Sequence, residues 1–129
     1  MIKRYKQRLG KSGEDLAVSF LKKERFEILE RNYRFGHKEI DIIGKDKNTI
    51  VFIEVKAGRS KNFGSPEERV NLKKQKSMIE VAQDYIQKKN LSEFDFRFDV
   101  VAINFERATR SQDAFAKIEH IKNAFMVVE

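Results

Sequence analysis

Residues 49–56 read Thr49-Ile50-Val51-Phe52-Ile53-Glu54-Val55-Lys56. The segment is rich in β-branched and aromatic residues, which predicts a strand. Because side chains alternate along a strand, Glu54 shares one face with Phe52 and Lys56. A carboxylate on a face that should be buried is costly unless it pairs with a positive group or binds a cation. The segment therefore predicts a central strand with a polar site at its end.

The preceding segment repeats this pattern. Residues 39–44 read Glu39-Ile40-Asp41-Ile42-Ile43-Gly44, a second strand, and residues 45–48 are short and turn-forming. The two strands should pair as an antiparallel hairpin, which brings Asp41 close to Glu54. Two adjoining carboxylates repel each other unless a proton or a divalent ion lies between them. In a chain without cysteine, oxygen ligands of this kind favour Mg²⁺ or Mn²⁺.

The remaining pattern completes one α/β domain over residues 1–129. Hydrophobic spacing predicts a helix over residues 12–23 with Ser12 as its N-cap, and a long helix over residues 65–89 that begins at Ser65 and Pro66. Further strands are expected at residues 26–33, 94–103 and 117–122. The order is one helix, three strands, one helix and two strands, which predicts a mixed sheet flanked by helices.

Composition narrows the classes of partner. Lysine and arginine outnumber aspartate and glutamate by 27 to 20, so the net charge is +7. A basic excess favours polyanions, because binding to phosphates releases condensed counterions. The absence of cysteine excludes disulfides and thiolate zinc, and no apolar run approaches the length of a membrane span. We expect a cytoplasmic protein with a nucleic-acid partner and no membrane association.

Other charged residues are candidates for the same site or for phosphate contacts. Glu14 lies at the edge of the inward face of the first helix and is a third acid for the site, although an acid at a helix start is equally explained by the helix dipole. Candidates for nucleic-acid contacts are Arg31, Arg34, Arg59 and Lys74.

These motifs resemble a known superfamily. Glu39-Ile40-Asp41, followed after twelve residues by Glu54-Val55-Lys56, resembles the D…(D/E)-x-K signature of the PD-(D/E)XK nuclease superfamily. The whole chain is similar to the YraN family of small uncharacterised bacterial proteins. The resemblance implies a restriction-endonuclease-like fold. The segments that carry the family resemblance are Gly13-Glu14-Asp15-Leu16-Ala17, Arg31-Asn32-Tyr33-Arg34, residues 39–43, residues 51–56 and Phe98-Asp99-Val100-Val101-Ala102-Ile103.

The resemblance also implies roles. Asp41 and Glu54 would hold the metal and Lys56 would be the catalytic lysine, while Glu14 matches a helix acid of the archaeal Holliday-junction-resolvase branch. Two departures are Lys38, where the family usually has glycine, and Ile40, where the superfamily name has proline. A similarity to junction resolvases implies a two-fold homodimer, although no residues indicate its interface.

Three functions remain open from the sequence. The first is a metal-dependent endonuclease that hydrolyses DNA phosphodiester bonds, with branched or flapped DNA as its substrate. The second is a non-catalytic nucleic-acid-binding module of the same fold, and the third is an interaction or scaffolding subunit. For the acids themselves, the alternative to a metal site is an internal salt bridge from Glu54 to Lys56 or Lys38.

Overall fold

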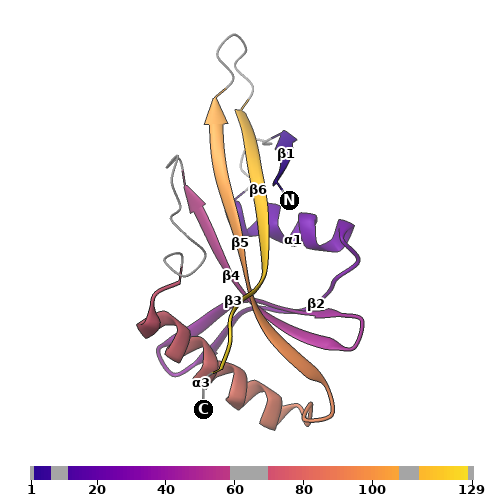
Figure 1. Cartoon of the computed structure of the whole chain (residues 1–129), viewed down its shortest axis with the longest axis vertical. Coiled ribbons are helices and arrows are strands. Elements are labelled where there is room, and N and C mark those ends of the chain that lie inside the picture. Colours follow the sequence, from indigo (N-terminus) through magenta and orange to yellow (C-terminus); the bar gives the residue numbers. More distant parts are fainter. Residues whose placement is uncertain (1, 7–11, 59–69, 108–113, 128–129) are drawn as a thin grey trace.

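The computed structural model describes residues 2–6, 12–58, 70–107 and 114–127 (Figure 1). The described strands form a six-stranded sheet in the order β1-β6-β5-β4-β3-β2. Neighbouring strands are antiparallel except for the central pair β4 and β5, which is parallel. The elements are β1 (Ile2–Lys6), α1 (Gly13–Lys23), β2 (Glu27–Phe35), β3 (Lys38–Asp46), β4 (Thr49–Gly58), α3 (Leu72–Lys88), β5 (Asp95–Arg107) and β6 (Ala114–Phe125).

The predicted class and order of elements are confirmed, with one addition. A mixed sheet is flanked by helices in the order helix, three strands, helix and two strands, and β1 precedes them as an edge strand paired with β6. The last two strands are longer than expected, since β5 extends to Arg107 and β6 spans Ala114–Phe125. A short basic segment such as β1 has no hydrophobic period of its own and becomes a strand through its pairing with β6.

The start of the long helix differs from the prediction. Asn71 has φ −70° and ψ 166°, an extended conformation, and its side chain accepts a hydrogen bond from the Lys74 amide at 2.8 Å. Asn71 is thus the N-cap, α3 begins at Leu72, and the predicted unbroken helix over residues 65–89 is wrong at this residue. The Ser65 and Pro66 start lies outside the described residues. For α1, the predicted Ser12 cap is confirmed by a 3.1 Å hydrogen bond from the Asp15 amide.

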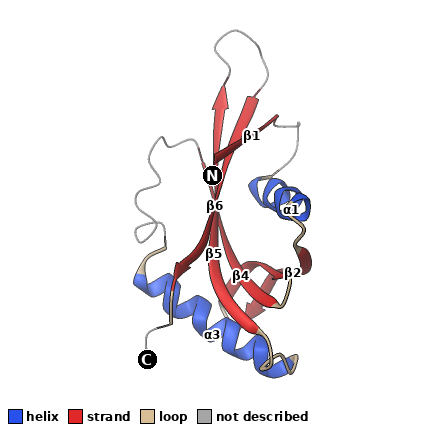
Figure 2. Cartoon of the chain, turned by 45° about the vertical axis from the view of Figure 1, so that its right-hand side comes forward, coloured by secondary structure: helices blue, strands red, loops and turns tan. Residues whose placement is uncertain are grey.

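In the described part of the chain, α1 and α3 cover opposite faces of the sheet (Figure 2). Both central strands contribute alternate side chains to the two resulting cores, which is why β4 and β5 are apolar on both faces. The core under α1 is formed by Leu16, Ala17, Phe20, Leu21, Ile42, Val51, Ile53, Val101 and Ile103, with others. The core under α3 is formed by Met78, Val81, Ala82, Tyr85, Ile40, Ile43, Ile50, Phe52, Phe98 and Val100, with others.

The start of α1 packs closely on the end of β4. A Cβ atom added to Gly13 would lie 2.5 Å from the Cβ of Ala57, well inside van der Waals contact. Only glycine allows the helix to approach the strand this closely. The first turn of α1, which carries Glu14, is therefore fixed beside the carboxyl end of β4.

Candidate metal centre

The hairpin places Asp41 and Glu54 next to each other. Its register runs from Asp46 opposite Thr49 to Ile42 opposite Ile53, and Asp41 and Glu54 are the next residues along the two strands. The short turn at Lys47 and Asn48 sets this register, as the sequence predicted. The two carboxyl groups are close enough for Asp41 to raise the pKa of Glu54.

The backbone is irregular beside this pair. Ile40 and Ile43 pack in the core under α3, whereas Ile42 packs under α1, so strict alternation breaks around Asp41. On the neighbouring strand, Asn32 occupies the register position between Arg31–Ile42 and Tyr33–Ile40, and has a left-handed φ of 53°. Asparagine adopts this conformation more readily than most residues. The irregularity turns Asp41 toward β4, where its Oδ2 accepts a hydrogen bond from the Val55 amide at 2.8 Å.

Glu54 is the acid of the pair whose pKa is clearly raised. Its residue is only 9% exposed. Burial and then the hydrogen bond and charge of Asp41 raise the pKa of Glu54 from 4.5 to about 7, against the opposing effect of Lys74. A carboxylate whose pKa is raised by a neighbouring carboxylate can instead share a cation with it. This confirms the predicted proximity of Asp41 and Glu54.

The positive group at the pair comes from α3. Lys74 Nζ lies 3.2 Å from Glu54 Oε2 and donates a hydrogen bond to the backbone oxygen of Glu39 at 3.4 Å. The Lys74 side chain is 34% exposed, so the ammonium is at the boundary between the site and solvent. The sequence singled out Lys74 for phosphate contact but did not anticipate this ion pair. The salt-bridge alternatives named Lys56 or Lys38, and Lys38 instead pairs with Glu80.

Lys56 lies two residues beyond Glu54 on β4 and is exposed. Alternation along the strand gives it the same face as Glu54. The structure thus supplies two lysines to this end of the sheet, one paired with an acid and one exposed.

Glu14 is held by a different set of partners. Its Oε1 accepts hydrogen bonds from Arg31 Nε and from Asn32 Nδ2, both at 3.0 Å. Arg31 Nη2 also lies 2.7 Å from Asp15 Oδ1, so this arginine fastens β2 to the first turn of α1. Asn32 lies opposite Asp41 in the register of β2 and β3, between the pairs Arg31–Ile42 and Tyr33–Ile40. Glu14 thus contacts Arg31 and Asn32, and the described residues contain no group of three acids arranged to hold a metal ion.

The three arginines predicted to contact nucleic acid have different surroundings. Arg34 is 72% exposed and its Nη2 lies 3.6 Å from Glu39 Oε2. Arg59 lies outside the described residues. Arg31 uses Nε and Nη2 in its contacts with the two acids of α1. Of the four predicted nucleic-acid contacts, Arg31 and Arg34 are exposed among the described residues, and Lys74 is partly exposed.

The chemistry of the acid pair fits one divalent cation. Asp41 and Glu54 present carboxylate oxygens, the ligands that Mg²⁺ and Mn²⁺ prefer, with water or substrate oxygens completing such sites. Across the described residues, no group of three or more histidine, cysteine, aspartate or glutamate side chains is arranged to hold a metal ion. The fit rests on the two acids at the hairpin and on their mutual repulsion.

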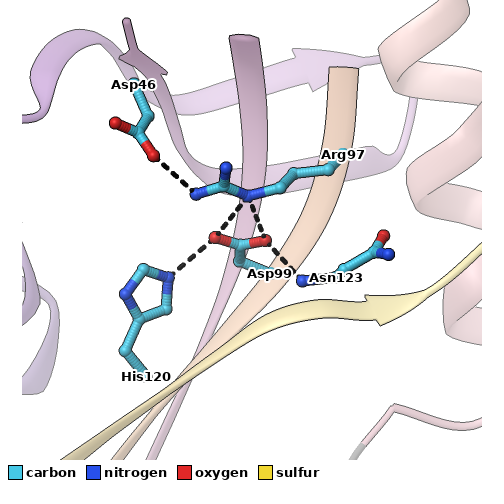
Figure 3. Close-up of polar contacts among 5 residues, drawn as sticks. All are labelled: Asp46, Arg97, Asp99, His120 and Asn123. Atoms are coloured by element: carbon cyan, nitrogen blue, oxygen red, sulfur yellow. Dashed lines mark hydrogen bonds and ion pairs between the residues drawn. The ribbon is translucent and has the colours of Figure 1, made fainter. Parts of the chain in front are cut away.

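A second charged cluster, on β5 and β6, was not predicted (Figure 3). Asp99 is fully buried, with 0% exposure. It accepts hydrogen bonds from Arg97 Nε at 3.0 and 3.2 Å and from the Asn123 amide at 2.9 Å, and its Oδ2 lies 2.7 Å from His120 Nε2. Arg97 also reaches Asp46 Oδ2 at 3.0 Å. An acid inside the apolar run at residues 98–103 was the signal that could have found this cluster.

The Asp99 cluster fixes a bulge in the sheet. Phe98 is opposite Phe125 but Val100 is opposite Ile121, so β6 has extra residues at this point. Asn123 adopts φ 55° there, and its backbone amide donates a hydrogen bond to Asp99. Burial alone would raise the pKa of Asp99, but the hydrogen bonds from His120, Arg97 and the Asn123 amide hold it below the usual value of 3.8. The cluster therefore maintains the shape of the sheet.

Of the helices in the described part of the chain, none has the length and hydrophobicity of a membrane-spanning segment.

Comparison with known proteins identifies the family. The profile of the uncharacterised protein family UPF0102 matches residues 13–103. A UPF0102 protein of Chlorobium chlorochromatii is 45% identical over 119 residues, which cover 92% of each chain. Another from Chloroherpeton thalassium is 48% identical over 102 residues, 79% of each chain. A third from Clostridium perfringens is 41% identical over 126 residues, 98% of this chain and 100% of the relative. The predicted YraN-like resemblance is thus confirmed, and the chain belongs to the uncharacterised protein family UPF0102.

Proposed function

We propose that this protein is a metal-dependent nuclease that hydrolyses phosphodiester bonds in DNA. The observation that carries the proposal is the juxtaposition of Asp41 and Glu54, two interacting carboxyl groups at adjoining positions of β3 and β4. Their setting resembles the D…(D/E)-x-K arrangement of the PD-(D/E)XK nucleases, with Lys56 at the third position. The net charge of +7 supports a polyanionic substrate.

Each residue of the site has a defined task in this proposal. Asp41 and Glu54 would hold Mg²⁺ or Mn²⁺. When bound, such an ion supplies charge neutralisation for the phosphate and lowers the pKa of an attacking water. Val55 keeps Asp41 oriented through its amide, because that hydrogen bond fixes one carboxylate oxygen at 2.8 Å. The exposed Lys56 would contact the phosphate and balance its charge.

Cleavage of a DNA panel tests the proposal. Linear, flapped and four-way-junction substrates would be incubated with the wild type and Mg²⁺ or Mn²⁺, beside Asp41→Asn and Glu54→Gln. We expect metal-dependent cleavage that falls by at least about 10²-fold in both variants, as is usual when a group that stabilises the transition state is removed. The matched controls are Asp95→Asn and Glu93→Gln, which neutralise exposed acids of the same types. Wild-type protein that leaves every substrate intact would contradict the proposal.

A second candidate is a nucleic-acid-binding module without catalysis. The ion pair between Lys74 and Glu54 favours it, because this lysine already offsets negative charge at the acid pair. In that case DNA binding would weaken steeply with salt and would persist in Asp41→Asn. Binding without metal-dependent cleavage by the wild type would select this candidate over the nuclease.

A further inference from the structure

The ammonium of Lys74 lies where oxygen atoms of two strands converge. Glu54 on β4 contributes a carboxylate oxygen at 3.2 Å, and Glu39 on β3 contributes a backbone oxygen at 3.4 Å. Asp41 interacts with Glu54 immediately beside this contact. A carboxylate and a carbonyl oxygen are also the ligands that hard cations take in proteins. Lys74 thus uses the acceptors that a metal ion would use.

The first turn of α3 delivers Lys74 to this position. Asn71 caps the turn through the Lys74 amide at 2.8 Å, and Gln75 Nε2 donates to the Val70 backbone oxygen at 2.8 Å. Val70 is buried in the core under α3, so the helix start is anchored on both sides of Lys74. The backbone of Lys74 is therefore fixed, while its four-carbon stem leaves the ammonium free to change partners.

A lysine and a divalent cation cannot both occupy this contact without repulsion. Both are positive and both seek the oxygens of Glu54, where burial weakens screening by solvent. We propose that Lys74 is a resident counter-ion of the acid pair, which a divalent cation displaces from Glu54 toward the substrate side. The inference rests on the proposed metal site and adds an internal competitor for it. Lys74 is then a positioning residue that sets metal affinity and becomes available to a phosphate only after the metal binds.

Calorimetric titration with Mg²⁺ tests this in the absence of DNA. The variants are Lys74→Met and Lys73→Met, titrated beside the wild type at about pH 8. Lys73 is an exposed neighbour on α3, so its variant controls for loss of one positive charge. We expect Lys74→Met to bind Mg²⁺ on the order of tenfold more tightly than the wild type, and Lys73→Met to change little. Equal affinities in Lys74→Met and Lys73→Met, or no Mg²⁺ binding by the wild type, would overturn the inference.

A measurement on the wild type covers the case in which Lys74→Met does not fold. The side-chain Cε resonances of the lysines would be followed by NMR during the Mg²⁺ titration. The resonance of Lys74 should shift toward that of exposed lysines, while that of Lys73 stays in place. A Lys74 resonance that does not move at saturating Mg²⁺ would contradict displacement.

The outcome separates this inference from the nuclease proposal. Tighter Mg²⁺ binding by Lys74→Met without DNA cleavage by the wild type would remove the nuclease function and leave the counter-ion role intact. Metal-dependent cleavage by the wild type together with unchanged Mg²⁺ affinity in Lys74→Met would support the nuclease function and overturn the counter-ion role.

Discussion

The Oδ2 atom of Asp41 accepts a hydrogen bond from the amide of Val55, 2.8 Å away. The Asp41 side chain on β3 is thus bonded to the backbone of β4 at the residue that follows Glu54. This contact holds one acid in place independently of any cation. It also gives Asp41 a structural task that Glu54 does not share. The two acids should therefore respond differently to substitution.

Replacing Asp41 separates its charge from its role as an acceptor. Asp41→Asn retains an oxygen that can accept the Val55 amide, whereas Asp41→Ala leaves that amide without its acceptor. We expect Asp41→Ala to have a free energy of unfolding about 1–2 kcal/mol lower than Asp41→Asn, the usual effect of an unsatisfied backbone donor. Urea unfolding of both variants without metal measures the difference. Equal stabilities would show that the Val55 hydrogen bond contributes nothing.

Glu54 should make the metal-free protein less stable as pH rises. Its folded pKa is about 7, above the ordinary 4.5, so the folded state holds this proton more tightly than the unfolded state. The contribution to stability is complete below about pH 4.5 and is lost as pH rises through about 7. The loss approaches about 3 kcal/mol at roughly 1.4 kcal/mol per pKa unit.

Urea unfolding from about pH 5 to pH 8 with a chelator present would measure this loss. Glu54→Gln cannot ionise and should flatten the profile, while the exposed Glu93→Gln should follow the wild type. Parallel profiles for Glu54→Gln and the wild type would refute the assignment. Added Mg²⁺ should restore stability to the wild type at about pH 8, because a bound ion stabilises the folded state.

Asp99 should dominate the stability of the sheet. Asp99→Asn removes a buried charge that Arg97 and His120 contact, which leaves Arg97 with only Asp46 as an acidic partner in the cluster. We expect the free energy of unfolding to fall by about 3–5 kcal/mol, the effect of breaking a buried ion pair. Asp95→Asn, an exposed acid of the same strand, should change it by less than about 0.5 kcal/mol. Thermal unfolding of the two variants checks the contrast.

The Asp99 cluster should also set the acid limit of the fold. Because the pKa of Asp99 is lowered in the folded state, its contribution is present above the ordinary value of 3.8 and is lost as pH falls through the folded pKa. The wild type should therefore lose stability below about pH 4 more steeply than Asp99→Asn. Identical acid limbs in the two unfolding profiles would contradict this.

Gly13→Ala tests the contact between α1 and β4. Alanine ordinarily favours a helix over glycine by about 1 kcal/mol, but its Cβ would lie 2.5 Å from that of Ala57. The clash should outweigh the helix preference and lower stability by about 1–3 kcal/mol. Gly58→Ala is the control, because an added Cβ there meets nothing within 4 Å. A stabilised Gly13→Ala would mean that the helix start shifts without cost.

Local sequence signals predicted the acid pair because a short turn sets the register. The alternation at residues 49–56 and the turn at residues 45–48 were enough to bring Asp41 beside Glu54. The contact of Lys74 with Glu54 was not predicted, because it depends on how α3 packs across the sheet and not on a local pattern of hydrophobic residues. The same holds for β1, whose strand conformation depends on β6.

Other misses follow from competition between partners. The helix start was expected at Ser65 and Pro66, but Asn71 is extended and caps α3 itself. Arg31 remains a predicted phosphate contact, and its ion pairs with two carboxylates of the first turn of α1, at 2.9 and 2.7 Å, were not predicted. Asp99 was read only as part of an apolar strand. The contacts of Arg31 and Asp99 depend on partners far away in the chain, whereas Asn71 caps the nearby Lys74 amide.

The parallel pairing of β4 with β5 has a consequence for how the molecule assembles. The chain must cross over through α3 between these strands, whereas β3 and β4 join through a tight turn. Hairpins of this kind form in microseconds, while non-local parallel pairing is slow because more chain must be ordered first. Asp41 and Glu54 should therefore come together early during folding, before α3 brings Lys74 to them, so a trapped intermediate would expose the two acids without their lysine.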